Sequence, residues 1–125
     1  MNKISIPKSE FEERKRTILK HMEERGLDLI IVYGDEYRKE NLRYVSNFWP
    51  LFEKGAAVFS QYAEPLVLCA PEGGEVCHEM SVWPDIRMVP DFLCVTVPDE
   101  IDYPLAKFTD FKRIAAEMRE KGCPL

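Results

Sequence analysis

Apolar residues recur at helical spacing in two long stretches, one near each end of the chain. In the first stretch one face is shared by four apolar side chains, Phe11, Ile18, Leu19 and Met22. In the last stretch the shared face carries Phe111, Ile114, Ala115 and Met118. Ser9 and Glu12 form an S-x-x-E pattern that predicts a capping box at the start of the first helix. Gly26 and Gly122 follow the two patterns and predict where the helices end.

Continuous apolar runs between these helices predict strands. The run from Leu27 to Tyr33 has no polar face, which favours a central strand covered on both sides. "AAVFS" (56–60) and "PLVLCA" (65–70) are separated by only four residues, so an antiparallel hairpin is expected. "DIRMV" (85–89) predicts a fourth strand. The segment 90–109 contains three prolines and is expected to be mostly irregular, apart from a short strand at 93–97.

Two short helices complete the pattern. "EYRKENLRYV" (36–45) follows the first strand, with Asp35 as the expected N-cap, and Val76 and Met80 lie four residues apart in a second one. Helices that alternate with strands predict one layered α/β domain over residues 1–125 with a mixed sheet. Because no strand follows the last helix, the final strand of the sheet is expected to be missing.

Charge and composition exclude several classes of function. The 17 basic and 22 acidic residues give a net charge of −5, and the basic groups are interleaved with glutamate, so nucleic-acid binding is not expected. The amino terminus lacks an apolar signal region and no apolar run is long enough for a membrane span, so we expect a cytoplasmic protein without membrane contact. The four cysteines form no C-x-x-C pair and are expected to be buried thiols rather than metal ligands or disulfides.

The sequence offers no catalytic constellation. There is no G-x-S-x-G, H-E-x-x-H or P-loop pattern, and the two histidines belong to separate predicted helices. His21 is expected on the surface, and Cys77 beside His78 is expected to have a structural role. Asp35 and Glu36 lie where ligands bind in open α/β sheets, but an N-cap is the simpler interpretation. We therefore predict no catalytic and no metal-binding residue in this chain.

An aromatic stretch, "KENLRYVSNFWPLFEKGAAVF" (39–59), stands out in a segment that reads as a loop. Tyr44 and Phe48 lie four residues apart, and packing against the core explains Tyr44 best and Phe48 in part. Trp49 and Phe52 flank Pro50 in an irregular segment, where a compact core absorbs them less easily. For these residues an intermolecular or interdomain contact and simple packing are equally supported.

Residues 9–50 resemble the amino-terminal domain of the creatinase/prolidase family, which includes the Xaa-Pro peptidases. The resemblance rests on an opening helix, an R-G-L-D-apolar strand and an N-x-x-Y-x-S-x-F pattern. The four residues of that pattern are Asn41, Tyr44, Ser46 and Phe48. The hairpin, "SVWPDIRMV" and the last amphipathic helix follow in the order of the family, so the resemblance covers nearly the whole chain.

The resemblance implies a three-layer α/β/α domain with a ribonuclease-H-like mixed sheet and no catalytic role. In the family, a following "pita-bread" domain binds two divalent metals, commonly manganese or cobalt, through two Asp, one His and two Glu. That domain is absent from these 125 residues, so this chain alone is expected to be inactive. Whether the parent enzyme is a peptidase or creatinase-like is left open.

The family also gives the aromatic stretch an expected role. In homodimeric relatives, the loop after N-x-x-Y-x-S reaches the catalytic pocket of the neighbouring subunit. Phe48, Trp49, Phe52 and Lys54 would then contribute to a substrate pocket or interface, with aromatic walls for a proline ring and Lys54 for a substrate carboxylate. The partners implied are its own catalytic domain, a second subunit and a proline-containing dipeptide or peptide. The alternative is a freestanding module that binds a small ligand or a protein.

Overall fold

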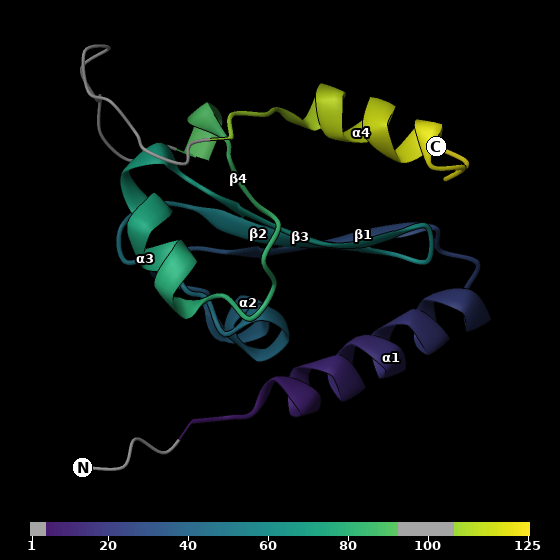
Figure 1. Ribbon diagram of the computed structural model, residues 1–125, viewed down its shortest axis with the longest axis horizontal. Helices are drawn as coiled ribbons and strands as arrows, with labels where there is room; N and C mark the ends of the chain where they lie inside the picture. Colours follow the sequence, from purple (N-terminus) through teal and green to yellow (C-terminus); the bar gives the residue numbers. More distant parts are fainter. Residues whose placement is uncertain (1–4, 93–106) are drawn as a thin grey trace.

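A four-stranded mixed sheet forms the middle layer of the computed structural model, which describes residues 5–92 and 107–125 (Figure 1). The strands are β1 (Leu29–Gly34), β2 (Gly55–Ser60), β3 (Ala63–Cys69) and β4 (Ile86–Met88), in that spatial order. The α-helices are α1 (Lys8–Glu24), α2 (Glu40–Ser46), α3 (Gly74–Met80) and α4 (Phe111–Glu120). Short 3₁₀ turns lie at Pro71–Gly73 (η1) and Pro90–Phe92 (η2).

The predicted hairpin and the fourth strand are confirmed. β2 and β3 pair antiparallel, with Ser60 opposite Ala63 at the tight turn, and β4 pairs parallel to β3. β1 pairs antiparallel with β2 on the other side, with Ile31 opposite Val58. The sheet is therefore mixed, as expected.

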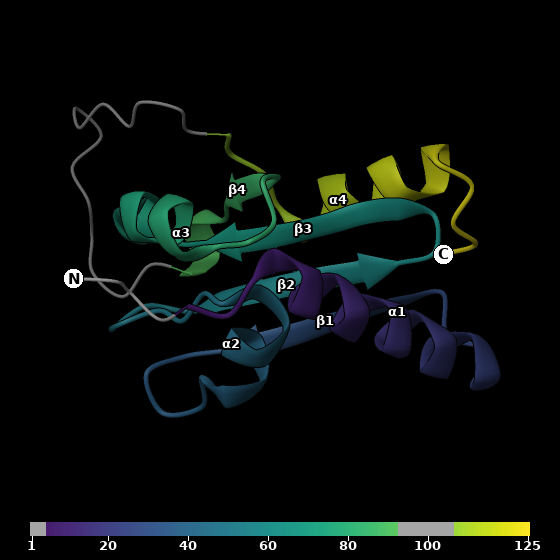
Figure 2. The same ribbon diagram turned by 60° about the horizontal axis from the view of Figure 1, so that its bottom comes forward.

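Each face of the sheet has its own hydrophobic core, which confirms the three-layer α/β/α fold. On one face the side chains of α1, α2 and α3 pack against alternate residues of β2 and β3, including Phe59 and Val67. On the other face Ile114 and Met118 of α4 pack against Val58 and Leu68. Figures 1 and 2 show α1 and α2 on one side of the sheet and α4 on the other. None of the described helices has the length and apolar character needed to cross a membrane.

The prediction that the first strand is central and covered on both faces is wrong. β1 lies at the end of the sheet order, where Ile30 and Val32 pack towards α1, α2 and α3 and Leu29 reaches the core under α4, each of them only partly buried. Ile31 and Tyr33, which alternate with them, are 47% and 43% exposed. The absence of a polar face in "LIIVY" reflects an apolar surface that no described helix covers, not burial on both sides.

Both predicted N-caps are also wrong. Helix α1 begins at Lys8 after Pro7, whose extended backbone (φ −68°, ψ 152°) leaves its carbonyl to accept the Glu10 N–H at 3.0 Å. Ser9 therefore lies inside the helix and makes no cap. Asp35 instead closes a turn, because its Oδ1 accepts the backbone N–H of Arg38 at 2.8 Å. Helix α2 starts only at Glu40.

The chain returns to the sheet once more before α4. Phe108 forms a single parallel bridge with Met88, supported by Met88 N–H to Lys107 O at 2.8 Å and Thr109 N–H to Met88 O at 2.9 Å. No strand follows α4 in the described part of the chain, and the predicted strand at 93–97 lies outside it.

Helix α4 is held to the sheet by an ion pair as well as by its apolar face. Arg87 points to the α4 side of β4, and its Nη2 lies 2.8 Å from Glu117 Oε1 and 3.1 Å from Asp85 Oδ2. Asp110 caps the helix by accepting the Arg113 N–H at 2.8 Å. The predicted stops after α1 and α4 are confirmed, because Gly26 and Gly122 have φ of 67° and 94°.

The Arg87–Glu117 pair predicts a loss of stability in acid. The hydrogen bond from the Arg87 guanidinium is the main cause that lowers the pKa of Glu117 from 4.5 to about 2. Its contribution is therefore complete above pH 4.5 and disappears as the pH falls towards 2. Because the pair is partly exposed to solvent, Glu117→Gln should cost about 1 kcal/mol at neutral pH, measured by urea unfolding. The loss should shrink below pH 4. Glu120→Gln, on the exposed side of α4, is the control; equal losses in both variants would contradict the prediction.

Candidate functional site

The aromatic loop, defined here as residues 47–54, leaves the end of α2 in a fixed direction. Asn47 adopts a left-handed conformation (φ 66°), which asparagine tolerates better than most residues, and its N–H donates to Arg43 O at 2.8 Å. Its side-chain Nδ2 donates to Met80 O at the end of α3, also at 2.8 Å. The first loop residue thus ends α2 and ties it to α3.

Ser46 supports the next residues from inside the core. Its buried Oγ donates to Leu42 O at 2.7 Å and accepts the backbone N–H of Phe48 at 3.1 Å. Phe48 is fully buried and packs so closely on Gly55 that a Cβ there would lie 2.8 Å from the ring. A glycine is therefore required where the loop enters β2.

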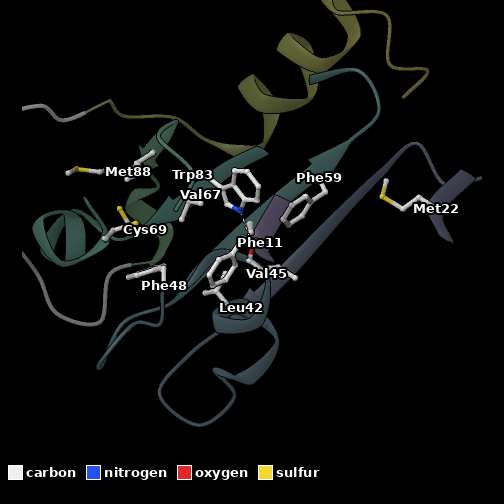
Figure 3. Packing of buried hydrophobic residues seen from close by; sticks show 13 residues of the cluster. Phe11, Met22, Leu42, Val45, Phe48, Phe59, Val67, Cys69, Trp83 and Met88 are labelled. Atoms are coloured by element: carbon white, nitrogen blue, oxygen red, sulfur yellow. Dashed lines mark hydrogen bonds between the residues drawn. The ribbon is translucent and has the colours of Figure 1, made fainter. Parts of the chain in front are cut away.

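Trp83 fastens the same helix end from the segment before β4. Its indole Nε1–H donates to Val45 O at 2.8 Å, the dashed line in Figure 3, and its ring packs edge-on against Phe59 with centroids 6.2 Å apart. The neighbouring Val82 N–H donates to Ser46 O at 3.0 Å. The base of the aromatic loop is consequently a buried, hydrogen-bonded structure.

The outer part of the aromatic loop presents apolar side chains to solvent. Phe52 is 71% exposed and Leu51 is 50% exposed. Trp49 is partly buried, and the Arg43 guanidinium lies over its ring at 4.2 Å from the centroid. Lys54 is exposed, while its backbone N–H donates to Phe92 O at 3.3 Å. This is a small apolar surface with two cations beside it.

Glu53 is the residue of the aromatic loop whose role the sequence did not reveal. It is only 7% exposed, its Oε2 accepts the Phe52 N–H at 3.0 Å, and its carboxylate packs against Gly73. The space that the carboxylate fills is left by Gly73, where a Cβ would lie 2.6 Å from Glu53 Oε1. Glu53 acts as an internal support that holds the exposed Phe52 outward.

Tyr44 does not pack in the core as predicted. It is 54% exposed, and the Arg14 guanidinium from α1 lies 4.1 Å from its ring centroid while Arg14 Nη1 donates to Tyr44 O at 2.8 Å. The helical phase explains the error, because α2 buries the face that carries Leu42, Val45 and Ser46, and Tyr44 points away from that face.

The cysteines are buried, as expected, wherever the structure describes them. Cys69 and Cys77 face each other across β3 and α3, and their hydrogen bond together with burial raises the pKa of the Cys77 thiol. Cys123 is buried at the end of the chain, and Cys94 lies outside the described residues. Over residues 5–92 and 107–125, no group of three or more His, Cys, Asp or Glu side chains could hold a metal ion.

Comparison with known proteins now adds to this geometry. A family model described as the Creatinase/Prolidase N-terminal domain matches residues 14–122. The chain belongs to the creatinase/prolidase N-terminal domain family. The crystal structure of an Xaa-Pro aminopeptidase from Streptococcus pyogenes has the same fold, with a TM-score of 0.53 and 16% identity. That match covers 66% of this chain and 58% of the other. No curated protein matches the sequence.

The N-x-x-Y-x-S-x-F pattern of this creatinase/prolidase domain has two parts in the structure. Ser46 and Phe48 are buried and shape the base of the aromatic loop, whereas Asn41 and Tyr44 are exposed. Of the predicted site residues, Phe48 is therefore buried at the base of the aromatic loop. Trp49 is partly buried, and Phe52 and Lys54 are exposed. Their role in a pocket or interface stays a prediction.

The buried hydroxyl of Ser46 allows a test of how the base of the aromatic loop is stabilised. Ser46→Ala removes the acceptor for the Phe48 N–H and should lower the free energy of unfolding by about 1 to 2 kcal/mol, because the buried N–H loses its partner. Urea unfolding followed by tryptophan fluorescence measures this. Ser9→Ala is the control: since Ser9 makes no cap, it should change stability by less than about 0.5 kcal/mol. A larger loss for Ser9→Ala than for Ser46→Ala would refute both assignments.

Proposed function

We propose that this chain is the non-catalytic amino-terminal domain of an Xaa-Pro dipeptidase- or aminopeptidase-like metallohydrolase that acts in the cytoplasm. In this proposal it contributes to dimerisation and to the rim of the substrate pocket. The family match over residues 14–122 is the observation that carries the proposal. The aromatic loop supports it, because a rigid base presents exposed apolar side chains that the domain's own core does not use.

The chemistry of the aromatic loop suits a proline-containing peptide. Phe52 offers an exposed aromatic ring and Trp49 a partly buried one with Arg43 over one face, and aromatic rings pack well against a pyrrolidine ring. Lys54 supplies a flexible cation that can meet a substrate carboxylate, as the resemblance implies. Phe48 acts indirectly, since it is buried and sets the path of the backbone.

In this proposal, metal chemistry lies outside the described residues. They provide no cluster of three metal-ligating side chains, so they do not fit the two divalent ions, manganese or cobalt, that the family implies. The proposal assigns those ions to a catalytic domain of the parent enzyme.

The isolated chain should therefore have no peptidase activity. Purified protein incubated with Mn²⁺ or Co²⁺ and an Xaa-Pro dipeptide should release no proline above the rate of a metal-only blank. Metal-dependent turnover that is lost on chelation and that co-purifies with the chain would overturn the non-catalytic assignment.

A second prediction concerns Phe52 in the parent enzyme. Phe52→Ala removes an exposed aromatic wall, so KM for a proline-containing peptide should rise roughly 3- to 10-fold with kcat little changed, as expected for lost ground-state binding. Tyr37→Ala is a matched control, because Tyr37 is 81% exposed but lies outside the aromatic loop. Equal kinetics for both variants and the unmodified enzyme would count against the pocket-rim role.

The alternative function is a freestanding module that binds a small ligand or a protein. The coding sequence beyond Leu125 separates the two. An open frame that supplies two Asp, one His and two Glu in the family's order supports the metallohydrolase. A stop codon at that point, together with saturable binding of a ligand by this chain alone, favours the module.

A further inference from the structure

The outer edge of β1 is an unpaired strand edge. β1 pairs with β2 on one side, and no described residue pairs with it on the other. Figure 2 shows β1 at the border of the sheet, with β2 beside it and β4 farthest away. A six-residue edge of this kind exposes a row of backbone N–H and C=O groups that can accept another strand.

β1 lacks the features by which proteins normally protect such an edge. The strand "LIIVYG" contains no charged residue and no proline, and the register shift in the sheet lies between Val58 and Ser60 in the β2–β3 pair, not in β1. Edge strands of monomeric proteins usually carry a lysine, a proline or a bulge that prevents pairing. None of these features protects β1.

Apolar surface flanks this edge on both faces of the sheet. On the α4 side, Ile31 and Tyr33 are 47% and 43% exposed. On the helix side, a groove of about 390 Å³ runs along β1 between Ile18 of α1 and Tyr44 of α2. An added strand would therefore gain apolar contacts above and below, besides backbone hydrogen bonds.

We propose that this edge binds β1 of a second copy of the chain, antiparallel, about a two-fold axis at Ile31. A two-fold axis perpendicular to the sheet places each residue opposite one that faces the same side, so Ile31 meets Ile31, Leu29 meets Tyr33, and Ile30 meets Val32. Every one of these cross-strand pairs is apolar. The two sheets join into one, with α4 of both copies on the same side.

Neighbouring registers are less favourable because of the acidic residues at the two ends of β1. An axis at Val32 would set Leu29 opposite Asp35 and Asp28 opposite Glu36, which places two like charges together. An axis at Ile30 would set Asp28 opposite Val32. The register centred on Ile31 sets Asp28 opposite Gly34, at the end of β1, and brings no two like charges together.

This inference rests on the proposed function in one respect, because that function includes self-association of the domain. The inference names β1 as the surface through which the two copies associate. It is independent of the aromatic loop, which β1 does not include. Pairing of two short strands buries less than the ~800 Å² per partner of a standard interface, so the dimer should be weak and reversible, with a dissociation constant on the order of 10 μM.

Sedimentation and a charge variant test the proposal. The unmodified chain should shift from monomer to dimer as its concentration is raised to about 1 mM. Ile31→Lys places a charge at the two-fold axis and should raise the dissociation constant at least tenfold, while its urea midpoint and circular dichroism show that it is folded. Tyr37→Lys introduces the same charge at an exposed aromatic outside β1 and should leave the dimer unchanged.

Cross-linking fixes the register. Residues on a two-fold axis in paired strands have Cα atoms about 4.5 to 5.5 Å apart, within reach of a disulfide. Ile31→Cys should therefore form a covalent dimer with diamide as oxidant, whereas Val32→Cys and the unmodified chain should not.

Several results would overturn the proposal. They are a strict monomer at every concentration, a dimer that Ile31→Lys leaves intact, efficient cross-linking at Val32→Cys instead, or an edge that binds only a foreign extended peptide. Failure of the aromatic loop tests with a β1 dimer still present would reject the pocket-rim role and leave this inference standing.

Discussion

The structure depends on the hydrogen bonds that the carbonyl groups at the carboxyl end of α2 accept. The last carbonyl groups of a helix have no partner within it, and leaving them buried and unpaired is costly. In this domain five consecutive carbonyls at that end each accept a hydrogen bond from a different group. The donors are Ser46 Oγ to Leu42 O, Asn47 N to Arg43 O, Arg14 Nη1 to Tyr44 O, Trp83 Nε1 to Val45 O, and Val82 N to Ser46 O. They come from α1, from the helix itself and from the segment before β4, so one helix end joins three separate parts of the chain.

This arrangement explains why an aromatic loop can be exposed without being loose. The backbone leaves α2 with Asn47 in a left-handed turn, Phe48 anchored in the core, and Glu53 buried behind Phe52. The apolar side chains that remain outside are therefore held by their buried neighbours. Binding residues carried on a rigid support lose little conformational freedom when they meet a partner, which makes such a loop suited to an interface.

The sequence predicted the elements that depend on local pattern and missed those that depend on what lies across space. The hairpin and α4 have strong periodicity and clear turn signals, and both were predicted well. The apolar run of β1 could not reveal that one face lacks a cover, because burial depends on helices distant in sequence. Tyr44 and Phe48 share a spacing but not an environment, since Phe48 lies beyond the end of α2 and turns inward. The burial of Glu53 could not be predicted from its neighbours in sequence, because the space that its carboxylate fills is left by the distant Gly73.

The geometry of a single helix explains where apolar surface remains. Strands lie about 4.8 Å apart and a helix with its side chains is about 10 Å wide, so one helix covers about two strands. On the α4 side the only described α-helix packs over β2 and β3 through Ile114 and Met118. β1 lies one strand farther out, which leaves Ile31 and Tyr33 in solvent. The opposite face has three helices and is covered more fully, with the groove beside β1 as its open margin. The exposed face of β1 thus follows from a sheet that is wider than the layer covering it, and its open edge from its place at the end of the strand order.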